Sequence, residues 1–324
     1  MDHALRAPLE SPTLAEMHAA RDRIAGTALR TPLVRLQVEA QPEIYLKLET
    51  LQPIGSFKLR GALNAIRATR AERLTDGVYT ASAGNMAQGL AWAAREAGVP
   101  CRIVAPDHIP QTKLAAIERL GATVRRIPFA DWWQAILDHH VPGEAGVFIH
   151  PGANPLVLAG NATIGLEIME ELSGVDAILA PFGSGGLACG IACSTRALRP
   201  ELPVYACELE SCAPFAAALA AARPVSVEYT PSFVDGIGGK SMLPEMWPLA
   251  RAVLAGSLAA TVRQVADAVR LLAERARVIA EGAGAASVAA ALARPMAVRR
   301  VVCVVSGGNI DTAKLMRILD GGMA

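Results

Sequence analysis

The apolar residues of the chain follow two alternating patterns. Short runs rich in β-branched residues predict strands, and longer runs rich in alanine and leucine predict helices between them. The predicted strands cover residues 43–49, 77–82, 101–106, 122–128, 177–181, 203–208 and 299–305. The clearest predicted helices cover 86–98, 111–121, 162–174 and 262–282, and alanine-rich stretches at 216–222 and 283–293 predict close-packed helices. This alternation predicts an α/β fold of mostly parallel sheets covered by helices.

Length and charge limit the classes of protein to consider. A chain of 324 residues is long enough for two domains. Its 31 basic and 30 acidic residues give a formal net charge of +1, which argues against nucleic acid or an anionic membrane surface as a partner. Apolar stretches stay below the roughly 20 residues that a membrane-spanning helix needs. We therefore expect a small-molecule ligand, no nucleic acid and no membrane partner.

The N-terminal segment and the cysteines indicate the compartment. Residues 1–12 lack a basic segment followed by an apolar core, so we expect a cytoplasmic protein. Cysteines at positions 101, 189, 193, 207, 212 and 303 lie mostly in apolar segments, as buried thiols in a reducing compartment do. Cys189 and Cys193 could share a helix face, but no other Cys or His lies close by in sequence, so we predict no metal site there.

Three glycine-bearing loops directly follow predicted strands. They are SAGNMAQG at 82–89, GSGGLACG at 183–190 and SGGN at 306–309. Ligands of α/β sheets collect beyond the carboxyl ends of strands, so the three loops could converge on one site. Backbone amides of GSGG, with a helix starting at Gly186 or Leu187, make this loop a candidate phosphate cradle. The loop has neither the G-x-G-x-x-G spacing nor a P-loop lysine, which disfavours NAD and ATP.

Lys58 lies in GSFKLRGA (55–62), behind a turn and directly ahead of a predicted helix. A solvated lysine in a first helical turn is the ordinary interpretation of such a position. A lysine amine together with a phosphate cradle would instead suit pyridoxal 5′-phosphate, whose aldehyde condenses with an amine and whose phosphate needs an anion site. The spacing alone leaves both interpretations open.

The ordered set GSFKLRGA, SAGNMAQG, GSGGLACG, AEGAGA (280–285) and SGGN resembles one known group. This group is the serine/threonine dehydratases and serine racemases among the fold type II pyridoxal-phosphate enzymes. The resemblance extends from TPLVRL at 31 to SGGN at 309. Cysteine-forming sulfhydrylases carry a T-G-S-x-K-D-R lysine motif instead, whereas Leu59, Arg60 and Gly61 follow the lysine here.

The resemblance implies a role for each motif residue. Lys58 would be the catalytic Schiff-base lysine, Phe57 and Gly236 would line the cofactor ring, and Glu281 would lie near it. Asn85 would hydrogen-bond the ring hydroxyl, and Ser306 would face the pyridine nitrogen. The amides of Gly183, Ser184, Gly185, Gly186 and Leu187 would bind the phosphate, while Ser82 and the backbone of Ala83, Gly84, Asn85 and Met86 would hold the substrate carboxylate. Taken singly, Phe57 could be core, Ser306 a helix N-cap, Asn85 a turn residue and Glu281 a solvated helix end.

The resemblance also implies an architecture and a reaction. We expect a two-lobed, tryptophan synthase β-like fold, with residues 1–76 and 149–324 in the large cofactor-binding lobe and 77–148 in a small mobile lobe, and a homodimer. We expect β-elimination of water from an L-β-hydroxy amino acid such as threonine or serine, giving a 2-oxo acid and ammonia. Serine racemases of the group have a second serine where this chain has Ala83, so we expect no efficient racemisation.

Some motif positions depart from the pattern of this group. Met86 replaces a histidine, and HPGANP (150–155) replaces H-P-F-D-D-P, so a larger or less polar substrate such as phenylserine is an alternative to threonine or serine. In the cation site of the group, CELESCAP (207–214) keeps Glu208 but has Pro214 in place of a carboxylate, so we predict no metal. A β-replacement synthase, or a cofactor-carrying or amino-acid-binding protein without turnover, is the alternative.

Overall fold

The computed structural model describes residues 6–39, 42–294 and 296–323, and it contains two sheets. The strands are β1 (Leu33–Arg35), β2 (Glu43–Leu48), β3 (Val78–Ala81), β4 (Cys101–Pro106), β5 (Thr123–Ile127), β6 (Val147–Phe148), β7 (Ala177–Pro181), β8 (Val204–Leu209), β9 (Gly256–Ala260) and β10 (Arg300–Val305). The six-stranded sheet has the order β1-β2-β10-β7-β8-β9, and β1 pairs antiparallel with β2 while its other pairs are parallel. The four-stranded sheet, β5-β4-β3-β6, is parallel throughout.

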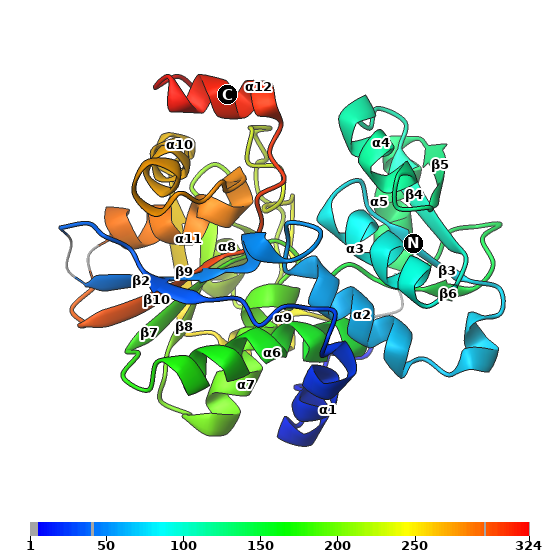
Figure 1. Ribbon diagram of the computed structural model, residues 1–324, viewed down its shortest axis with the longest axis horizontal. Coiled ribbons are helices and arrows are strands. Elements are labelled where there is room, and N and C mark those ends of the chain that lie inside the picture. Colours follow the sequence, from blue (N-terminus) through cyan, green and yellow to red (C-terminus); the bar gives the residue numbers. More distant parts are fainter. Residues whose placement is uncertain (1–5, 40–41, 295, 324) are drawn as a thin grey trace.

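Helices cover both sheets. They are α1 (Leu14–Ile24), α2 (Lys58–Ala68), α3 (Asn85–Glu96), α4 (Gln111–Glu118), α5 (Phe129–Asp138), α6 (Pro155–Glu171), α7 (Gly186–Leu198), α8 (Pro214–Ala221), α9 (Trp247–Val253), α10 (Val262–Leu271), α11 (Gly282–Ala293) and α12 (Thr312–Leu319), with short turns η1 (Glu49–Leu51), η2 (Ala71–Leu74) and η3 (Leu272–Ala276). In Figure 1, α6 and α7 lie on one side of the larger sheet and α10 and α11 on the other. This arrangement confirms the predicted α/β fold. Among the described helices, none is long and apolar enough to cross a membrane.

The central strands of the larger sheet contribute to two hydrophobic cores. Successive side chains of a strand point to opposite faces of its sheet. In β7, Ile178 and Ala180 belong to the core beneath α6 and α7, while Ala177 and Leu179 belong to the core beneath α10 and α11. The strand β10 divides in the same way. Because both faces are buried, these strands are continuous apolar runs in the sequence.

The helix α2 lies between the two sheets and carries Lys58 at its first position. One side packs on α6, where the backbones come so close that a Cβ at Gly61 would lie 2.7 Å from Val157 Cγ1, and one at Gly160 would lie 2.6 Å from the Arg60 carbonyl oxygen. On its other side, Leu59, Ala62, Leu63 and Ile66 pack in the core of the smaller sheet and α3. Movement of α2 would therefore disturb both halves of the molecule.

A buried ion network fixes the orientation of α2. The side chain of Arg60 is 1% exposed and donates from Nε to Glu49 Oε2 at 2.8 Å and from Nη1 to Glu167 Oε1 at 2.6 Å. The ammonium of Lys47, fully buried, lies 2.7 Å from Glu167 Oε2. Buried charges are tolerated when they are paired and hydrogen-bonded in this way. Arg60 thus anchors α2 one half-turn beyond Lys58.

Several helices begin where the sequence provides a capping residue. The hydroxyls of Thr13 and Thr261 accept from backbone amides of α1 and α10 in capping boxes, and Asn154 and Asp311 cap α6 and α12. These residues satisfy amides that would otherwise lack an acceptor at the first helical turn.

The structure differs from the predicted elements at three places. The predicted helix 262–282 ends at Leu271, continues as the π-helical turn η3, and then stops because Arg277 adopts a left-handed conformation with φ of 58°. The strands β1, β6 and β9 were not predicted, since β1 and β6 are very short and β9 is rich in Gly, Ser and Ala. The helix α8 was expected to be close-packed, but Leu219 on it is 38% exposed.

The smaller sheet with α3, α4 and α5 lies within residues 77–148, and the larger sheet is formed by segments on either side. We propose that these two parts are the small and large lobes. Residues 1–5, 40–41, 295 and 324 of the predicted large lobe lie outside the described residues.

Candidate active site

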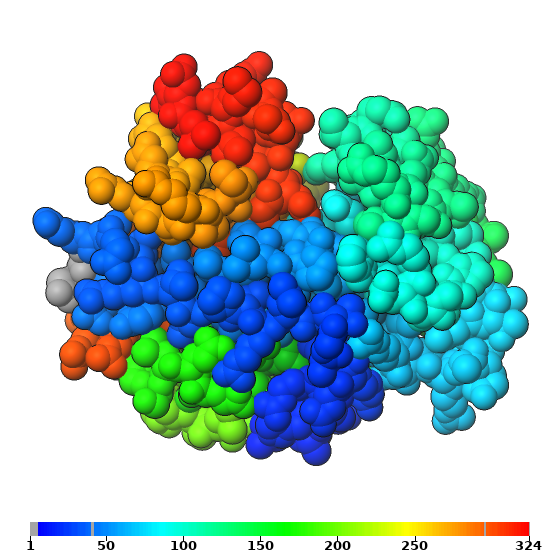
Figure 2. Space-filling model, in the orientation of Figure 1, coloured from blue at the N-terminus to red at the C-terminus, as the bar shows by residue number. Residues whose placement is uncertain are grey.

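A cavity of about 580 Å³ lies where the loops after β3, β7 and β10 meet. All residues assigned to the site from the sequence line it, namely Phe57, Lys58, Ser82, Ala83, Gly84, Asn85, Met86, Gly183, Ser184, Gly185, Gly186, Leu187, Gly236, Glu281 and Ser306. In Figure 2 the surface is hollowed between the red C-terminal segment and the teal part that contains α4. The predicted convergence of the three glycine-bearing loops is confirmed.

Lys58 extends from the start of α2 into this cavity. Its Nζ donates a hydrogen bond to the Pro151 carbonyl oxygen at 2.6 Å. Removal from bulk water lowers the pKa of the amine from 10.5 to about 8, and the negative charge of Glu281 opposes part of this change. The ordinary interpretation, a solvated lysine on a helix surface, is therefore wrong for Lys58.

The turn before Lys58 is held by the loop after β10. The amide of Phe57 donates to the Ser306 carbonyl oxygen at 3.0 Å, and the amide of Gly308 donates to the Gly55 carbonyl oxygen at 2.9 Å. These two bonds bring the GSFK and SGGN motifs together from opposite ends of the chain. Ser306 is 3% exposed and precedes no helix directly, so it is not a helix N-cap.

The GSGG loop presents backbone amides to the cavity. Gly185 has φ of +90°, and a Cβ there would lie 2.7 Å from Met246 Cγ, so both conformation and space require glycine. The helix α7 begins at Gly186, as predicted. Within the described chain, the amides of residues 183–187 donate to no protein acceptor. Such a group of amides at a helix start suits an anion.

The loop 150–155 contacts both the GSGG loop and Lys58. His150 is 1% exposed, and its Nδ1 accepts from the amides of Gly152 at 3.0 Å and Ala153 at 2.7 Å. Burial, reinforced by the nearby charges of His139 and Lys58, lowers the pKa of His150 well below its usual range, so the ring is neutral. A Cβ at Gly152 would lie 2.0 Å from Ser184 Oγ, so this loop packs tightly on the GSGG loop. The altered residues of HPGANP are Gly152, Ala153 and Asn154, and Asn154 caps α6. The unaltered Pro151 lines the cavity.

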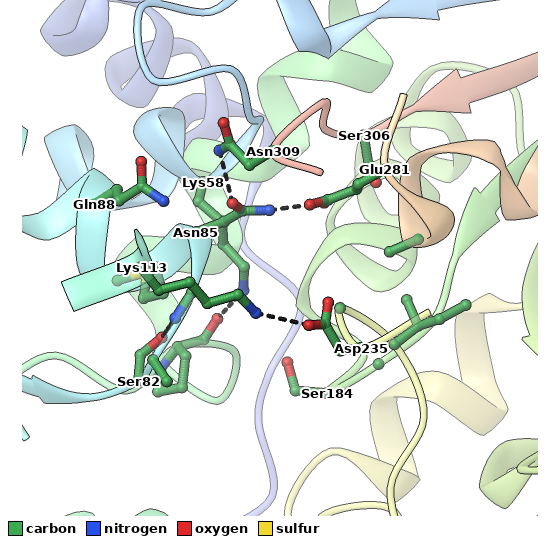
Figure 3. Close-up of a pocket in the computed structure, with 18 of the residues that line it drawn as sticks. Lys58, Ser82, Asn85, Gln88, Lys113, Ser184, Asp235, Glu281, Ser306 and Asn309 are labelled. Atoms are coloured by element: carbon green, nitrogen blue, oxygen red, sulfur yellow. Dashed lines mark hydrogen bonds and ion pairs between the residues drawn. The ribbon is translucent and has the colours of Figure 1, made fainter. Parts of the chain in front are cut away.

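Asn85, Glu281 and Asn309 form a polar chain beside Lys58 (Figure 3). Asn85 Nδ2 donates to Glu281 Oε1 at 2.8 Å, and Asn309 Nδ2 donates to Asn85 Oδ1 at 2.8 Å. Burial raises the pKa of Glu281 to about 7, and the charge of Asp235 adds to this effect. Glu281 is therefore a buried carboxyl group rather than a solvated helix end. A Cβ at Gly236 would lie 2.7 Å from Ala283 Cβ, so glycine is required there too.

Several lining residues were not singled out from the sequence. Lys113 on α4 pairs with Asp235 at 2.7 Å across the cavity, as Figure 3 shows, and Gln88 and Asn309 also line it. Lys113 and Asp235 are 122 positions apart, so no local pattern could have identified the pair. Asn309 belongs to the SGGN motif, but the resemblance implies no role for it.

Glu208 lies at the position that the resemblance assigns to a cation site. Its carboxylate accepts from the amides of Phe215 at 2.8 Å and Ala216 at 2.9 Å, and from the Ser257 hydroxyl at 2.6 Å. In the described part of the chain, no group of three or more His, Cys, Asp or Glu could hold a metal ion. The residues present do not fit a cation, because the carboxylate already caps α8.

The family model of pyridoxal-phosphate dependent enzymes matches residues 24–307. The chain belongs to this family. Among relatives of this pyridoxal-phosphate enzyme, the L-threonine ammonia-lyase of Thermotoga maritima is 38% identical over 318 residues, which cover 96% of this chain and 79% of that protein. The structure of serine racemase from Dictyostelium discoideum has a TM-score of 0.85 and 31% identity, with 93% of this chain and 100% of that chain covered. The structure of threonine deaminase from T.th. has a TM-score of 0.82 and 32% identity, covering 93% and 99%.

These comparisons confirm the family, the fold type and the cofactor predicted from the sequence. The residues present fit that cofactor. A partly buried amine of lowered pKa suits its aldehyde, and the amides of residues 183–187, which have no acceptor in the described chain, suit its phosphate.

Proposed function

We propose that this pyridoxal-phosphate enzyme is an ammonia-lyase that removes water from an L-β-hydroxy amino acid of the threonine or serine type. The products are a 2-oxo acid and ammonia. The observation that carries the proposal is a single cavity in which the amine of Lys58 and the free amides of residues 183–187 both line the wall. The similarity to an L-threonine ammonia-lyase over nearly the whole chain supports this reaction. The cytoplasmic location and the homodimer stay predictions.

Each lining residue receives a role toward the cofactor. The amides of residues 183–187 bind the phosphate, and Phe57 and Gly236 line the ring, with Glu281 beside it. Asn85 donates to the ring hydroxyl oxygen, and the hydroxyl of Ser306 faces the pyridine nitrogen. Ser306 is 3% exposed and lines the cavity, which supports this assignment.

Bound pyridoxal phosphate supplies an electron sink that stabilises negative charge at the α-carbon of an amino acid. Lys58 is the base: its neutral amine takes the α-proton, and a pKa of about 8 keeps a useful fraction neutral near physiological pH. Ser306 is an uncharged partner for the ring nitrogen, so it does not force protonation there. A ring that is not protonated would be a weaker electron acceptor, and we expect this to favour loss of the β-hydroxyl group as water.

The substrate lies against the small-lobe wall. Ser82 and the backbone of residues 83–86 hold its carboxylate at the start of α3. Ala83 offers only a methyl group, which cannot carry a proton to the opposite face of the α-carbon, so racemisation is inefficient. Met86, Trp132 and Ile136 contribute apolar surface to the cavity wall. This wall supports a second candidate substrate with a bulkier β-substituent, such as phenylserine.

A substrate panel tests the proposal. Stereoisomers of serine, threonine, 3-hydroxyaspartate and phenylserine are incubated with the holoenzyme and scored for ammonia, 2-oxo acid and inverted amino acid. We expect ammonia and 2-oxo acid in equal amounts from at least one L-isomer, with little D-serine formed from L-serine. Product that incorporates an added thiol or amine without oxo acid would identify a β-replacement synthase. Racemisation as fast as oxo-acid release would refute the assignment of Ala83.

A further inference from the structure

The side-chain amide of Asn85 is held on two sides by residues of the other half of the molecule. Its Nδ2 donates to Glu281 Oε1 and its Oδ1 accepts from Asn309 Nδ2, both at 2.8 Å. Asn85 is the first residue of α3, whereas Glu281 and Asn309 lie before α11 and after β10. Figure 3 shows Asn85 between these two partners. One hydrogen of Asn85 Nδ2 is left without an acceptor in the described residues.

Asn309 is itself fixed by the turn that leads to Lys58. Its Nδ2 also donates to the Ile54 carbonyl oxygen at 2.8 Å. Its Oδ1 lies over Gly55, where an added Cβ would be 2.9 Å away and where φ is +68°. Both hydrogens of Asn309 Nδ2 are therefore used, each on an oxygen.

This arrangement permits one orientation of each amide. If the Asn309 amide turned over, its oxygen would face two other oxygens, those of Ile54 and Asn85. If the Asn85 amide turned over, two nitrogen donors would face each other. Glu281 alone would not impose the choice, because with a pKa of about 7 it exists both as carboxylate and as carboxylic acid near neutrality. The acid could donate to an amide oxygen, whereas Asn309 Nδ2 can only donate.

We propose that Asn309 is a positioning residue that fixes the Asn85 amide with its remaining N–H toward the cavity, where it donates to an anionic oxygen of the bound ligand. Under the proposed function, on which this inference rests, that oxygen is the phenolate oxygen of the cofactor ring. A hydrogen bond to an ionised oxygen favours the ionised form. Asn309 would therefore favour the ionised form of that oxygen through the Asn85 amide.

The test uses the spectrum of the holoenzyme without substrate. Asn309→Asp has nearly the same shape but donates no hydrogen bond, and it puts an oxygen against Asn85 Oδ1. We expect a larger share of the absorption band of the protonated ring hydroxyl, and cofactor binding that is weaker by about ten-fold. Gln88→Glu is the control, since it adds the same charge to the same cavity wall without a hydrogen bond to Asn85 in the described chain. Circular dichroism verifies that both variants are folded.

The double variant Asn85→Ala with Asn309→Asp shows whether Asn309 acts through Asn85. We expect Asn309→Asp to change the spectrum strongly in the parent and hardly at all when Asn85 is absent. An unchanged band ratio in Asn309→Asp, an equal change in Gln88→Glu, or an effect that persists without Asn85 would each overturn the inference. Because no substrate is used, a holoenzyme that releases no ammonia from any amino acid would refute the proposed reaction and leave this result standing.

Discussion

The amine of Lys58 lies in the cavity, partly buried and 2.6 Å from a carbonyl oxygen. A pKa of about 8 in place of 10.5 raises the neutral fraction of the amine near pH 7 by about two orders of magnitude. Only the neutral amine attacks an aldehyde or accepts a proton. The local environment of one residue thus makes an amine that is ordinarily protonated available as a base at physiological pH.

We predict that uptake of pyridoxal phosphate by the apo-protein follows this pKa. The rate should rise as pH approaches about 8 and level off above it, since the amine is then already neutral. The free amine of Nα-acetyl-lysine is the control, and its rate should keep rising to about pH 10.4. Stopped-flow absorbance measures both. A protein rate that follows the control up to pH 10 would mean that the amine is not perturbed.

Motif residues were predictable one by one, whereas their partners were not. The glycines, Lys58 and Asn85 are identified by short ordered motifs. Asp235 and Pro151 are identified only by the fold, since they contact Lys113 and Lys58 across long stretches of chain. Burial of Glu281 also depends on packing that no local pattern encodes.

Among the elements, the start of α8 is hydrogen-bonded to one side chain of β8, that of Glu208. Glu208, at the end of β8 and 1% exposed, accepts from two amides at the start of α8, where Pro214 is the first residue. Burial raises the pKa of this carboxyl group, and its hydrogen bonds from Ser257 and the backbone oppose the rise. A helix cap therefore occupies the position to which the sequence resemblance assigns a cation site.

We predict that Glu208→Gln lowers the free energy of unfolding by about 1–3 kcal/mol, because an amide cannot accept from both backbone N–H groups and leaves one unsatisfied. Glu210→Gln is the control, because it removes the same charge from a side chain that is half-exposed. It should change the free energy of unfolding by less than about 0.5 kcal/mol. Thermal unfolding with and without a chelator should give the same midpoint for the parent. Marked stabilisation by a divalent cation would contradict this account of Glu208.

The apolar strands and the helices that alternate with them lie where the sequence pattern predicts them. The strands β7 and β10 are recognisable in the sequence as apolar runs, because both faces of their sheet are buried. The boundaries of β4 also agree with the predicted strand 101–106. The break after η3 was missed, because the helical pattern continues through Val278 and Ile279 while the backbone turns at Arg277.

Across the whole molecule, polar side-chain contacts join the two proposed lobes. Lys113 meets Asp235 at the cavity, and His139 Nε2 lies 2.9 Å from Glu245 Oε1 near the end of α5. The Lys113 and Asp235 side chains are 33% and 47% exposed, so this pair contributes little to global stability. It can still hold α4 against the opposite wall.

We predict that Asp235→Asn speeds amide hydrogen exchange in α4 by at most about five-fold and leaves the unfolding midpoint nearly unchanged. Added salt should produce the same change in the parent, because it screens an exposed pair. The control is Glu201→Gln, which removes an exposed pair with Arg199 far along the chain and should leave α4 unaffected. If amide exchange in α4 became faster in Glu201→Gln, or did not become faster in Asp235→Asn, the pair would not restrain α4.

The close contact between Gly152 and Ser184 has a mechanical consequence. The anion-binding end of the cavity and the amine end share one short loop, since Gly152 rests on the GSGG turn and its neighbour Pro151 supplies the oxygen that Lys58 touches. A bulkier residue at position 152 would have to move off Ser184, and we expect that shift to carry the Pro151 carbonyl oxygen away from Lys58.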